Sequence, residues 1–488
     1  MKRLIIAVLG IVVILAGVVV IRALPSAEQS ASGTPYPLAV DVELASELMS
    51  QAIQYETISY GRDKPTSGKA LRDFHAFLED RFPRVHAELT YETVNEFSLL
   101  YHWQGSGNGA EKPVLLLGHM DVVPIIPGTA DEWDHAPYAG VIDETYVWGR
   151  GAMDDKLNVI AGLQAIEMML EAGLRPKRDI YLAFGHDEEQ GGLEGAREIA
   201  RLLKQRNVQA EFLIDEGGAV VEGAVPGLTV SVAAVAPAEK GIVTLELIAR
   251  GKGGHSSMPP KQSSIGILSA GIVRLEENPF PRDFSHTQKF LEAIADDLPF
   301  SQRLVMKNLW LFKPLVMQQM QNERAMQAAM RTTTAATIMN AGVKANVLPI
   351  SARALVNFRI LPGETKESVK AKVIEILDDT RISVEYSQSG QIPMDPSPVS
   401  PLSGFGWEHL QATIRDIAAP ERIIIAPRLL VAATDTRHYR EISDNHYRFV
   451  WMRANSKDLG RIHGTNERIE KKSIADAVRF YHRFISQL

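Results

Sequence analysis

The sequence of 488 residues contains no cysteine. Disulfide bonds and thiolate chemistry are therefore excluded, and any metal ion that the protein binds must be held by histidine and carboxylate side chains. The chain also lacks an excess of positive charge, because 52 lysines and arginines face 59 aspartates and glutamates and the formal net charge is −7. Nucleic-acid binding needs a basic surface that meets the phosphates, so this balance argues against a nucleic-acid partner.

The N-terminus carries an uncharged apolar run from Leu4 to Ile21, with two basic residues before it and Arg22 after it. Its 18 residues are about the minimum for a helix that spans a bilayer, whereas the apolar core of a signal peptide usually has roughly 7–15 residues. The preceding positive charges favour keeping that end in the cytoplasm. We expect residues 1–24 to anchor the chain in a membrane, with the rest outside the cytoplasm, periplasmic or extracellular. A cleaved secretion signal is the alternative.

The length of the chain and its apolar pattern predict two domains. Residues 25–41 are rich in serine, alanine and proline and are expected to form a linker. Beyond them, short apolar runs alternate with stretches of helical pattern, which predicts an α/β domain with a mixed, largely parallel sheet flanked by helices. The runs cover residues 114–117, 179–184 and 211–214, and the helical stretches cover 158–173 and 193–206. We assign residues 42–238 and 391–488 to this domain.

The pattern changes at about residue 239, where strand candidates and helices follow in a different order. The strands cover 241–249, 332–338, 352–360 and 382–386, and the helices cover 264–277 and 365–379. This order is typical of a small α+β domain with an antiparallel sheet, so we assign residues 239–390 to an inserted domain. Within it, residues near 288–330 are predicted to be an extra helical insertion. Its methionine-rich part forms either ordinary core or a lipid-accepting groove.

Four clusters of polar residues carry the chemistry, and three of them directly follow predicted strands. They are Gly118–Asp121 (GHMD), Trp148–Lys156 (WGRGAMDDK), His186–Glu189 (HDEE) and Asp215–Gly218 (DEGG). Each alone has an ordinary interpretation as a surface histidine, a glycine-rich turn, a helix cap or a solvated acidic turn. Together they would crowd carboxylates at one sheet edge, where mutual repulsion calls for cations. Two Zn²⁺ ions about 3.5–4 Å apart would neutralise this charge and share a water molecule.

These motifs, in this order, resemble the aminoacylase/carboxypeptidase S family of co-catalytic dizinc metallopeptidases, and within it carboxypeptidase S and the N-fatty-acyl-amino-acid synthase/hydrolases. The similarity runs from about Val42 to the C-terminus. Besides the four clusters, it includes GGHSSMPP (253–260), NFRILPG (357–363), TDTR (434–437) and RIHGTNE (461–467). The resemblance implies a zinc-peptidase catalytic domain with an inserted lid or dimerisation domain, and hence a possible homodimer.

By this resemblance, five residues bind two zinc ions per subunit. They are His119 and Asp215 for one ion, Glu189 and His463 for the other, and Asp154 as the bridge between the two. Glu216 is the alternative to Asp215, because the family varies at that position. The bond between Asp154 and Asp155 is often cis in similar proteins. A mixed histidine and carboxylate shell also suits Co²⁺ or Mn²⁺.

The resemblance also implies the catalytic and substrate-binding residues. Glu188 would be the general acid and base, and Asp121 would orient His119 through its second ring nitrogen. His255 would stabilise the oxyanion, commonly from the partner subunit. The residues expected to hold the substrate carbonyl or carboxylate are Asn346, Arg359 and Arg437. Arginine suits a carboxylate because its guanidinium binds both oxygens, although Arg359 could instead form a salt bridge within the insert.

We therefore expect a metal-dependent hydrolase that cleaves the amide bonds of N-acyl amino acids or small peptides with a free C-terminal carboxylate. One alternative keeps the same enzyme but runs the reaction toward amide synthesis, because similar proteins condense fatty acids with amino acids. The other is a metal-binding, receptor-like relative without turnover. That alternative predicts the loss of the base or of a ligand, and this sequence retains them.

Overall fold

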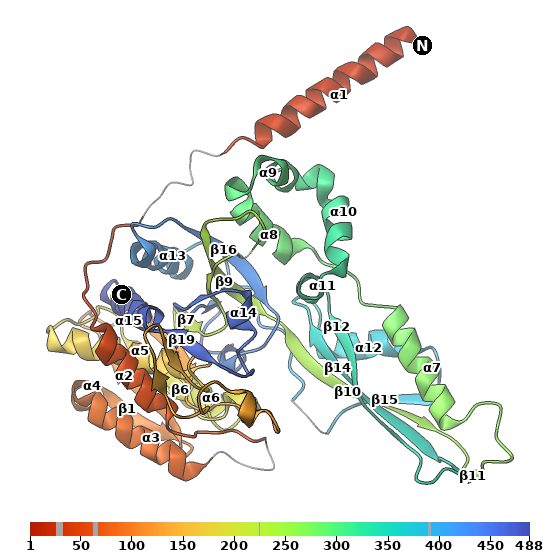
Figure 1. The fold of residues 1–488 in the computed structure, drawn as a ribbon, viewed down its shortest axis with the longest axis horizontal. Coiled ribbons are helices and arrows are strands. Elements are labelled where there is room, and N and C mark those ends of the chain that lie inside the picture. The colour runs from red at the N-terminus through yellow and green to blue at the C-terminus, as the bar shows by residue number, and fades with distance from the viewer. Residues whose placement is uncertain (26–32, 62–66, 224, 389–391) are drawn as a thin grey trace.

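The computed structural model describes residues 1–488 except 26–32, 62–66, 224 and 389–391, and it divides into two parts (Figure 1). One part surrounds a ten-stranded mixed sheet, here called the large sheet, and the other surrounds a four-stranded antiparallel sheet, here called the insert sheet. The chain crosses from the first to the second where β9 (Ser231–Glu239) is followed, after Lys240, by β10 (Gly241–Arg250). The crossing lies next to residue 239, at which the sequence predicts the start of an inserted domain.

The centre of the large sheet consists of parallel strands. These are β6 (Ile180–Gly185), β3 (Val114–His119), β7 (Phe212–Asp215) and β17 (His446–Arg448), in that spatial order. Antiparallel strands flank them on both sides. On one side lie β2 (Ser98–Trp103) and β1 (Thr90–Val94), and on the other lie β9 and β8 (Ala219–Val221). Two further strands are parallel to their neighbours, since β16 (Ile423–Leu430) pairs with β9 and β18 (Arg453–Ala454) pairs with β8. Every residue of β3 is buried, which explains why this strand is a continuous apolar run in the sequence.

Helices cover both faces of the large sheet. Leu116 of β3 belongs to the core cluster formed with α2 (Val42–Ile53), α5 (Lys156–Glu171), α13 (Phe405–Ala418) and α15 (Lys471–Ser486). Its neighbours Leu115 and Leu117 point to the opposite face and pack with α6 (Ala196–Gln205). The predicted fold class, a mixed and largely parallel sheet flanked by helices, is confirmed.

The insert sheet has the order β12, β14, β10, β15, with all pairs antiparallel. Its strands β12 (Thr333–Ala341), β14 (Ser351–Ile360) and β15 (Ile382–Tyr386) lie within a few residues of their predicted positions. Helices α7 (Ser264–Glu277) and α12 (Lys366–Leu377) share one core with this sheet. At the end far from the large sheet, β11 (Gly254–His255) pairs with β13 (Val347–Leu348) in a small two-stranded antiparallel sheet (Figure 1).

The extra helical insertion consists of α8 (Ser285–Ile294), α9 (Phe300–Met306), α10 (Leu309–Gln319) and α11 (Arg324–Met330). The sequence predicts these helices but places them within the inserted domain. Their apolar side chains, among them Leu291 and Val316, instead share a cluster with Val232 of β9 and Ile424 of β16. The insertion therefore packs on the edge of the large sheet, because an apolar helix face does not specify in the sequence which surface will cover it.

Lys240 joins three of these segments at the crossing between the two parts. Its backbone N–H donates to Leu430 O at the end of β16 (3.0 Å). Its ammonium group donates to Ala328 O (2.9 Å) and Arg331 O (2.7 Å) at the end of the helical insertion. Burial lowers the pKa of Lys240 to about 7, and the nearby charge of Arg359 lowers it further.

The N-terminal helix α1 (Lys2–Arg22) projects from the body of the molecule (Figure 1). Among the described residues it is the one helix that is long and apolar enough to cross a membrane, with a mean hydropathy of 3.4 over an 18-residue window within Arg3–Arg22. The predicted linker 25–41 falls partly outside the described residues. From residue 33 it contacts α13 and α15, where Thr34 N–H donates to Asp416 (2.8 Å) and Tyr36 Oη lies 2.7 Å from His482 Nδ1.

Candidate metal centre

The clusters that the sequence places after the strands meet at one edge of the large sheet. His119 and Asp215 are the last residues of the adjacent strands β3 and β7, and the turn Glu188–Gln190 follows β6, the other neighbour of β3. Because the carboxyl ends of parallel strands lie at the same edge, side chains distant in the sequence converge there. Asp154 and His463 reach the same place from the loops before α5 and β19 (Arg468–Glu470).

Two groups of potential ligands share the carboxylate of Asp154. One group is His119, Asp154 and Glu216, and the other is Asp154, Glu189 and His463, with the ligand atoms of each group within 4.8 Å of one another. Asp154 Oδ1 lies 3.0 Å from His119 Nε2, and Asp154 Oδ2 lies 3.0 Å from His463 Nε2. Glu189 Oε1 lies 3.2 Å from His463 Nε2. Each Asp154 oxygen therefore serves one group, which is the arrangement of a bridging carboxylate.

These separations fit the coordination shells of two metal ions. Ligands of a tetrahedral ion with bonds of about 2.0–2.1 Å lie roughly 3.3 Å apart. The donor atoms are imidazole nitrogens and carboxylate oxygens, which suit divalent ions such as zinc. The peptide bond between Asp154 and Asp155 is cis, as the resemblance leads us to expect.

Without a cation, the concentrated negative charge holds protons at this site. Hydrogen bonds to Asp154 and Glu189 raise the pKa of His463 to about 10. Burial alone would lower the pKa of His119, but hydrogen bonds to Asp121, Asp154 and Glu216 outweigh burial and raise it. Burial raises the pKa of Glu189 to about 6, and the neighbouring charge of Asp154 adds to this effect. The site therefore favours positive charge, which protons supply when metal ions do not.

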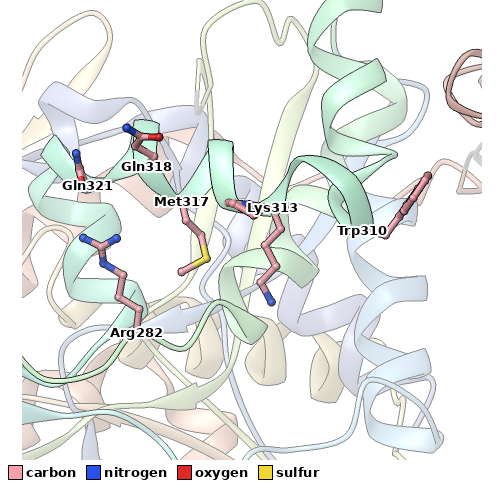
Figure 2. A pocket seen from close by; sticks show the side chains of 7 residues that line it. Arg282, Trp310, Lys313, Met317, Gln318 and Gln321 are labelled. Carbon is pink, nitrogen blue, oxygen red and sulfur yellow. The ribbon is translucent and has the colours of Figure 1, made fainter. Parts of the chain in front are cut away.

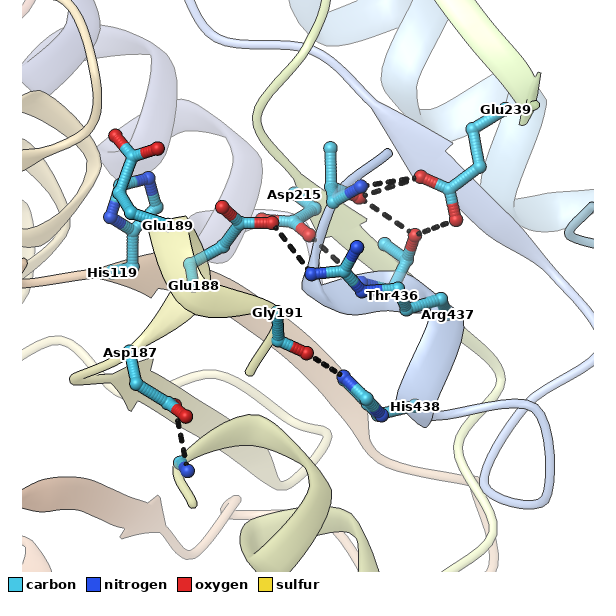
Figure 3. A network of polar contacts seen from close by, with 12 residues as sticks. His119, Asp187, Glu188, Glu189, Gly191, Asp215, Glu239, Thr436, Arg437 and His438 are labelled. Carbon is cyan, nitrogen blue, oxygen red and sulfur yellow. Dashed lines mark hydrogen bonds and ion pairs between the residues drawn. The ribbon is translucent and has the colours of Figure 1, made fainter. Parts of the chain in front are cut away.

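The structure brings Glu216 rather than Asp215 to the first ligand group. Glu216 Oε1 lies 3.5 Å from His119 Nε2. Asp215 uses both of its oxygens elsewhere, because Oδ1 accepts from Glu216 N–H (2.9 Å) and Oδ2 accepts from Thr436 N–H (3.1 Å). Our expectation of Asp215 as the ligand is thus not supported by the geometry, which matches the alternative. Asp215 instead connects β7 to the turn that carries Arg437 (Figure 3).

Asp121 contacts both the ring of His119 and the acidic turn Glu188–Gln190. His119 Nδ1 lies 2.9 Å from Asp121 O and 3.4 Å from Asp121 Oδ1, which leaves Nε2 directed at the ligand group. The same carboxylate accepts from the backbone N–H groups of Glu188 (3.1 Å) and Glu189 (3.2 Å) and from the hydroxyl of Ser59 (2.7 Å). Asp121 is fully buried, so these hydrogen bonds compensate for its lost hydration.

Glu467 holds the loop that presents Asp154, a role that the sequence did not indicate. Its Oε1 accepts from the backbone N–H groups of Gly151 (3.1 Å) and Met153 (2.8 Å). Its Oε2 forms an ion pair with Arg150 (2.6 Å), and both side chains are buried. Glu467 lies four residues after His463, so one short segment supplies a ligand and positions the shared carboxylate. The sequence points to Glu467 only through its position at the end of the RIHGTNE motif (461–467).

Glu188 and Arg437 form an ion pair beside the ligand groups (Figure 3). Arg437 Nη2 donates to Glu188 Oε1 at 3.1 Å, and both side chains are nearly buried. Burial raises the pKa of Glu188 to about 8, and the charge of Arg437 opposes this effect. The turn that carries Arg437 is held by Glu239, whose carboxylate accepts from Thr434 N–H (2.7 Å) and from Arg448 (3.0 Å).

Arg359 reaches the same region from the insert. It lies near the end of β14, and the charges of Arg437 and Glu188 both act on it. Burial lowers the pKa of Arg359, and the positive charge of Arg437 lowers it further. Among the described residues, no hydrogen-bond or ion-pair partner is found for its guanidinium, whereas Arg437 is already bound to Glu188. The expected alternative, a salt bridge of Arg359 within the insert, is therefore not formed among these residues.

His255 and Asn346 lie together at the tip of the insert and not at the metal centre of their own chain (Figure 1). His255 belongs to the two-stranded β11–β13 sheet, and Asn346 O accepts from Ser256 N–H (3.1 Å). Both residues are exposed, and His255 Nδ1 lies 2.7 Å from Ser257 Oγ. Within one subunit, these two expected site residues are thus separated from the others.

The sequence profile of peptidase family M20/M25/M40 matches residues 115–487. The chain belongs to this family. It is 38% identical over 449 residues to the probable carboxypeptidase S-like 2 of Dictyostelium discoideum, a match that covers 91% of this chain and 85% of that protein. It is also 38% identical over 445 residues to the N-fatty-acyl-amino acid synthase/hydrolase PM20D1 of Mus musculus, covering 90% and 86%.

A solved structure shows the same M20 fold. The M20 family metallo-carboxypeptidase Sso-CP2 from Sulfolobus solfataricus matches with a TM-score of 0.63 at 16% identity, covering 92% of this chain and 99% of that chain. The resemblance that the motifs indicated is therefore confirmed. The chain is an M20-type amidohydrolase, and the residues gathered at its sheet edge form a potential metal site.

Replacing Glu467 should weaken metal binding by this M20 enzyme. In Glu467→Gln an amide group would face the backbone N–H donors of Gly151 and Met153, so the loop that presents Asp154 should loosen. Loss of such a supporting partner typically costs about 10–100-fold in metal affinity. Competition with a chelator measures the affinity, and Glu470→Gln on β19 is the control. Unchanged affinity in Glu467→Gln would contradict the role that we give this residue.

Metal binding should release protons, because hydrogen bonds to the surrounding carboxylates raise the pKa values of His119 and His463 and so favour their protonated rings. Metal ligation requires neutral imidazole, so we expect about one proton to leave the histidine of each ligand group that is filled near pH 7. Apparent affinity should rise with pH until the folded-state pKa of His463, about 10, is passed. Titration calorimetry in two buffers of different ionisation enthalpy counts the protons, and a buffer-independent heat would refute this expectation.

Proposed function

We propose that this M20 enzyme hydrolyses N-acyl amino acids or small peptides that carry a free C-terminal carboxylate, with two zinc ions in its active site. The observation that carries the proposal is the sharing of Asp154 between two ligand groups, next to the Glu188–Arg437 ion pair. A shared carboxylate holds two cations close together, and a buried glutamate beside them is placed to move a proton.

The ligand sets follow the observed groups. His119, Asp154 and Glu216 would hold one ion, and Asp154, Glu189 and His463 the other. Zinc is our choice because its tetrahedral shell accepts nitrogen and oxygen ligands at the observed separations, although Co²⁺ or Mn²⁺ could occupy the same donors. When bound, two such ions lower the pKa of a shared water molecule to roughly 7 and polarise the amide carbonyl.

Glu188 would accept the proton of the attacking water and return it to the leaving amine. Arg437 supports this role in two ways, because its ion pair holds the carboxylate in place and favours the ionised, proton-accepting form against the effect of burial. Two cations nearby would lower the pKa of Glu188 further. Asp121 would act as the positioning residue, since it binds the backbone of the Glu188–Glu189 turn and the ring of His119.

We assign Arg359 rather than Arg437 to the substrate carboxylate. Arg437 already forms an ion pair with Glu188, whereas Arg359 is half-buried beside them without such a partner among the described residues. Its guanidinium would bind both oxygens of a carboxylate. This position would select substrates that end in a free acid.

A second copy of the chain would supply His255 and Asn346. The exposed two-stranded sheet of β11 and β13 lies at the far end of the insert, so a partner subunit would bring both residues to the metal centre, where His255 would stabilise the oxyanion. A homodimer through the insert follows from this proposal.

The direction of reaction depends on concentrations as well as on the site. The mouse relative is named a synthase/hydrolase, and the residues that move the proton serve both directions by microscopic reversibility. We propose hydrolysis as the principal activity and synthesis of the same amide bond as its reverse. Assays started from the N-acyl amino acid and from the free acid plus amino acid would distinguish the two.

We propose that α1 remains attached as a membrane anchor, with the catalytic part outside the cytoplasm. The length and hydropathy of the helix support this, and its buried C-terminal end supports an integral role in the fold. A cleaved secretion signal would leave a mature protein without residues 1–24. N-terminal sequencing of the protein purified from membranes decides between the two.

Replacing Glu188 should abolish turnover and preserve the metal. Loss of a general acid and base typically costs about 10²–10⁴-fold in rate, so Glu188→Gln should lose that much kcat on every substrate in a screen of N-acyl amino acids and dipeptides. Metal content, measured by elemental analysis, should equal that of the wild type. The surface variant Glu441→Gln is the control. Full activity of Glu188→Gln would refute the assignment, and no hydrolysis by the metal-loaded wild type would refute the function.

Replacing Arg359 should weaken binding of free acids selectively. Hydrogen bonds to charged groups contribute about 1.5–3 kcal/mol, so Arg359→Gln should raise KM roughly 10- to 100-fold for N-acyl amino acids. The C-terminal amides of the same substrates should show no such increase, because they lack the carboxylate. Arg353→Gln on the same strand, which removes an exposed pair with Glu246, is the matched control. An equal effect of Arg359→Gln on acids and amides would contradict this role.

A further inference from the structure

The C-terminal end of α1 is docked on the helical insertion and is not simply tethered to it. Asn308, fully buried between α9 and α10, donates through Nδ2 to Val19 O (2.9 Å). Arg303 of α9 donates through Nε to Ala23 O (2.8 Å). Val19 and Ala23 are buried, although the remainder of the helix is exposed along its length. The contacts fix where the apolar helix leaves the body of the protein.

The same pair of helices exposes large apolar side chains. Trp310 is 53% exposed and Leu315 is 57% exposed, and Leu311 and Phe300 are also exposed. The other five of the six tryptophans in the chain are buried. An exposed cluster of this kind marks an interaction surface, and tryptophan is the residue type enriched where an apolar phase meets water.

Cations surround these apolar side chains. A groove of about 400 Å³ between the end of α1 and the insertion is lined by Arg22, Lys307, Trp310 and Lys313, among others. A second groove, of about 710 Å³, lies on the other side of Trp310 and Lys313 and includes Arg282 and Met317. Figure 2 shows Arg282, Lys313 and Met317 pointing into the space beside α10, with Trp310 standing apart from them.

We propose that α9 and α10 form a membrane-docking collar around the exit of α1. In this arrangement Trp310, Leu311 and Leu315 lie among the upper acyl chains of the bilayer, and Arg22, Arg282 and Lys313 meet the phosphates of the lipid head groups. The combination of apolar side chains, one exposed tryptophan and flanking lysines and arginines is that of an interfacial helix. The inference rests on the proposed retention of α1 as an anchor.

The collar is continuous with α1, and this indicates that the surface covering its exposed apolar side chains is a lipid bilayer. A helix of this hydropathy with its apolar residues exposed needs a lipid environment, and its fixed end sets the collar at the depth of the head groups. The collar is in turn bound to β9 and β16 by the apolar cluster that contains Leu291, Val316 and Ile424. Docking would therefore hold the large sheet, and the metal centre at its edge, in one orientation to the membrane.

Tryptophan quenching in vesicles tests the proposal. The full-length protein is reconstituted into phosphatidylcholine/phosphatidylglycerol vesicles, with and without lipids brominated in the acyl chains. Because Trp310 is the one exposed tryptophan, brominated lipids should quench a component of the emission that is absent in Trp310→Phe. The aqueous quencher acrylamide should lose access to this component on transfer from detergent to vesicles. Leu311→Asp/Leu315→Asp should reduce lipid quenching and leave hydrolysis of a soluble substrate unchanged.

A relocated tryptophan provides the matched control. Trp310→Phe/Val343→Trp moves the exposed indole to the tip of the insert, where Val343 is almost fully exposed, and this indole should remain open to acrylamide and unaffected by brominated lipid. If the wild type floats with the vesicles and Trp310 behaves like that control, the collar is disproved while the anchor stands. If the protein does not float, α1 is not an anchor and the collar is disproved with it. Both outcomes leave the proposed hydrolysis untouched.

Discussion

The structure depends on one electrostatic constraint. Several carboxylates converge on a single sheet edge, where two groups of potential metal ligands share the carboxylate of Asp154. Asp154 places one oxygen against each histidine, so the two ligand groups cannot be separated. In the absence of cations the repulsion is relieved by protons, as the raised pKa values of His463 and Glu189 indicate. Buried side chains around the site hold the loops that carry these charged groups in place.

Those supports are also carboxylates, and each binds backbone N–H groups that belong to distant segments. Asp121 holds the Glu188–Glu189 turn, Glu467 holds the loop of Asp154, and Glu239 holds the turn of Arg437. Because each is buried, its hydrogen bonds must be satisfied within the protein, and the loops are correspondingly restrained. Three loops with little regular structure of their own are thereby fixed to a rigid sheet, which is what a site with sub-ångström requirements needs.

Most of the fold could be predicted from the sequence, and the polar clusters that the sequence singles out meet at one sheet edge. Buried parallel strands leave continuous apolar runs, which is why the predicted run at 114–117 lies within β3, and α7 and β15 have their predicted bounds. His463 entered through resemblance alone, because a histidine in a glycine-flanked loop has no periodicity. Neither the choice between Asp215 and Glu216 nor the role of Glu467 could be predicted, since both depend on side-chain direction and on backbone partners hundreds of residues away. The surface that covers the helical insertion was missed for a similar reason, because an amphipathic helix does not identify its neighbour.

Lys240, the residue between β9 and β10, connects the two parts of the molecule through its hydrogen bonds. The ammonium group of Lys240 donates to Ala328 O and Arg331 O at the end of the helical insertion. Glu239, the residue before it, accepts from Thr434 N–H in the turn that carries Arg437. Ile242, two residues after it, pairs with Arg359 in the insert sheet. Because these contacts fall within four consecutive residues of β9, Lys240 and β10, the position of Arg359 is tied through the backbone to that of the helical insertion.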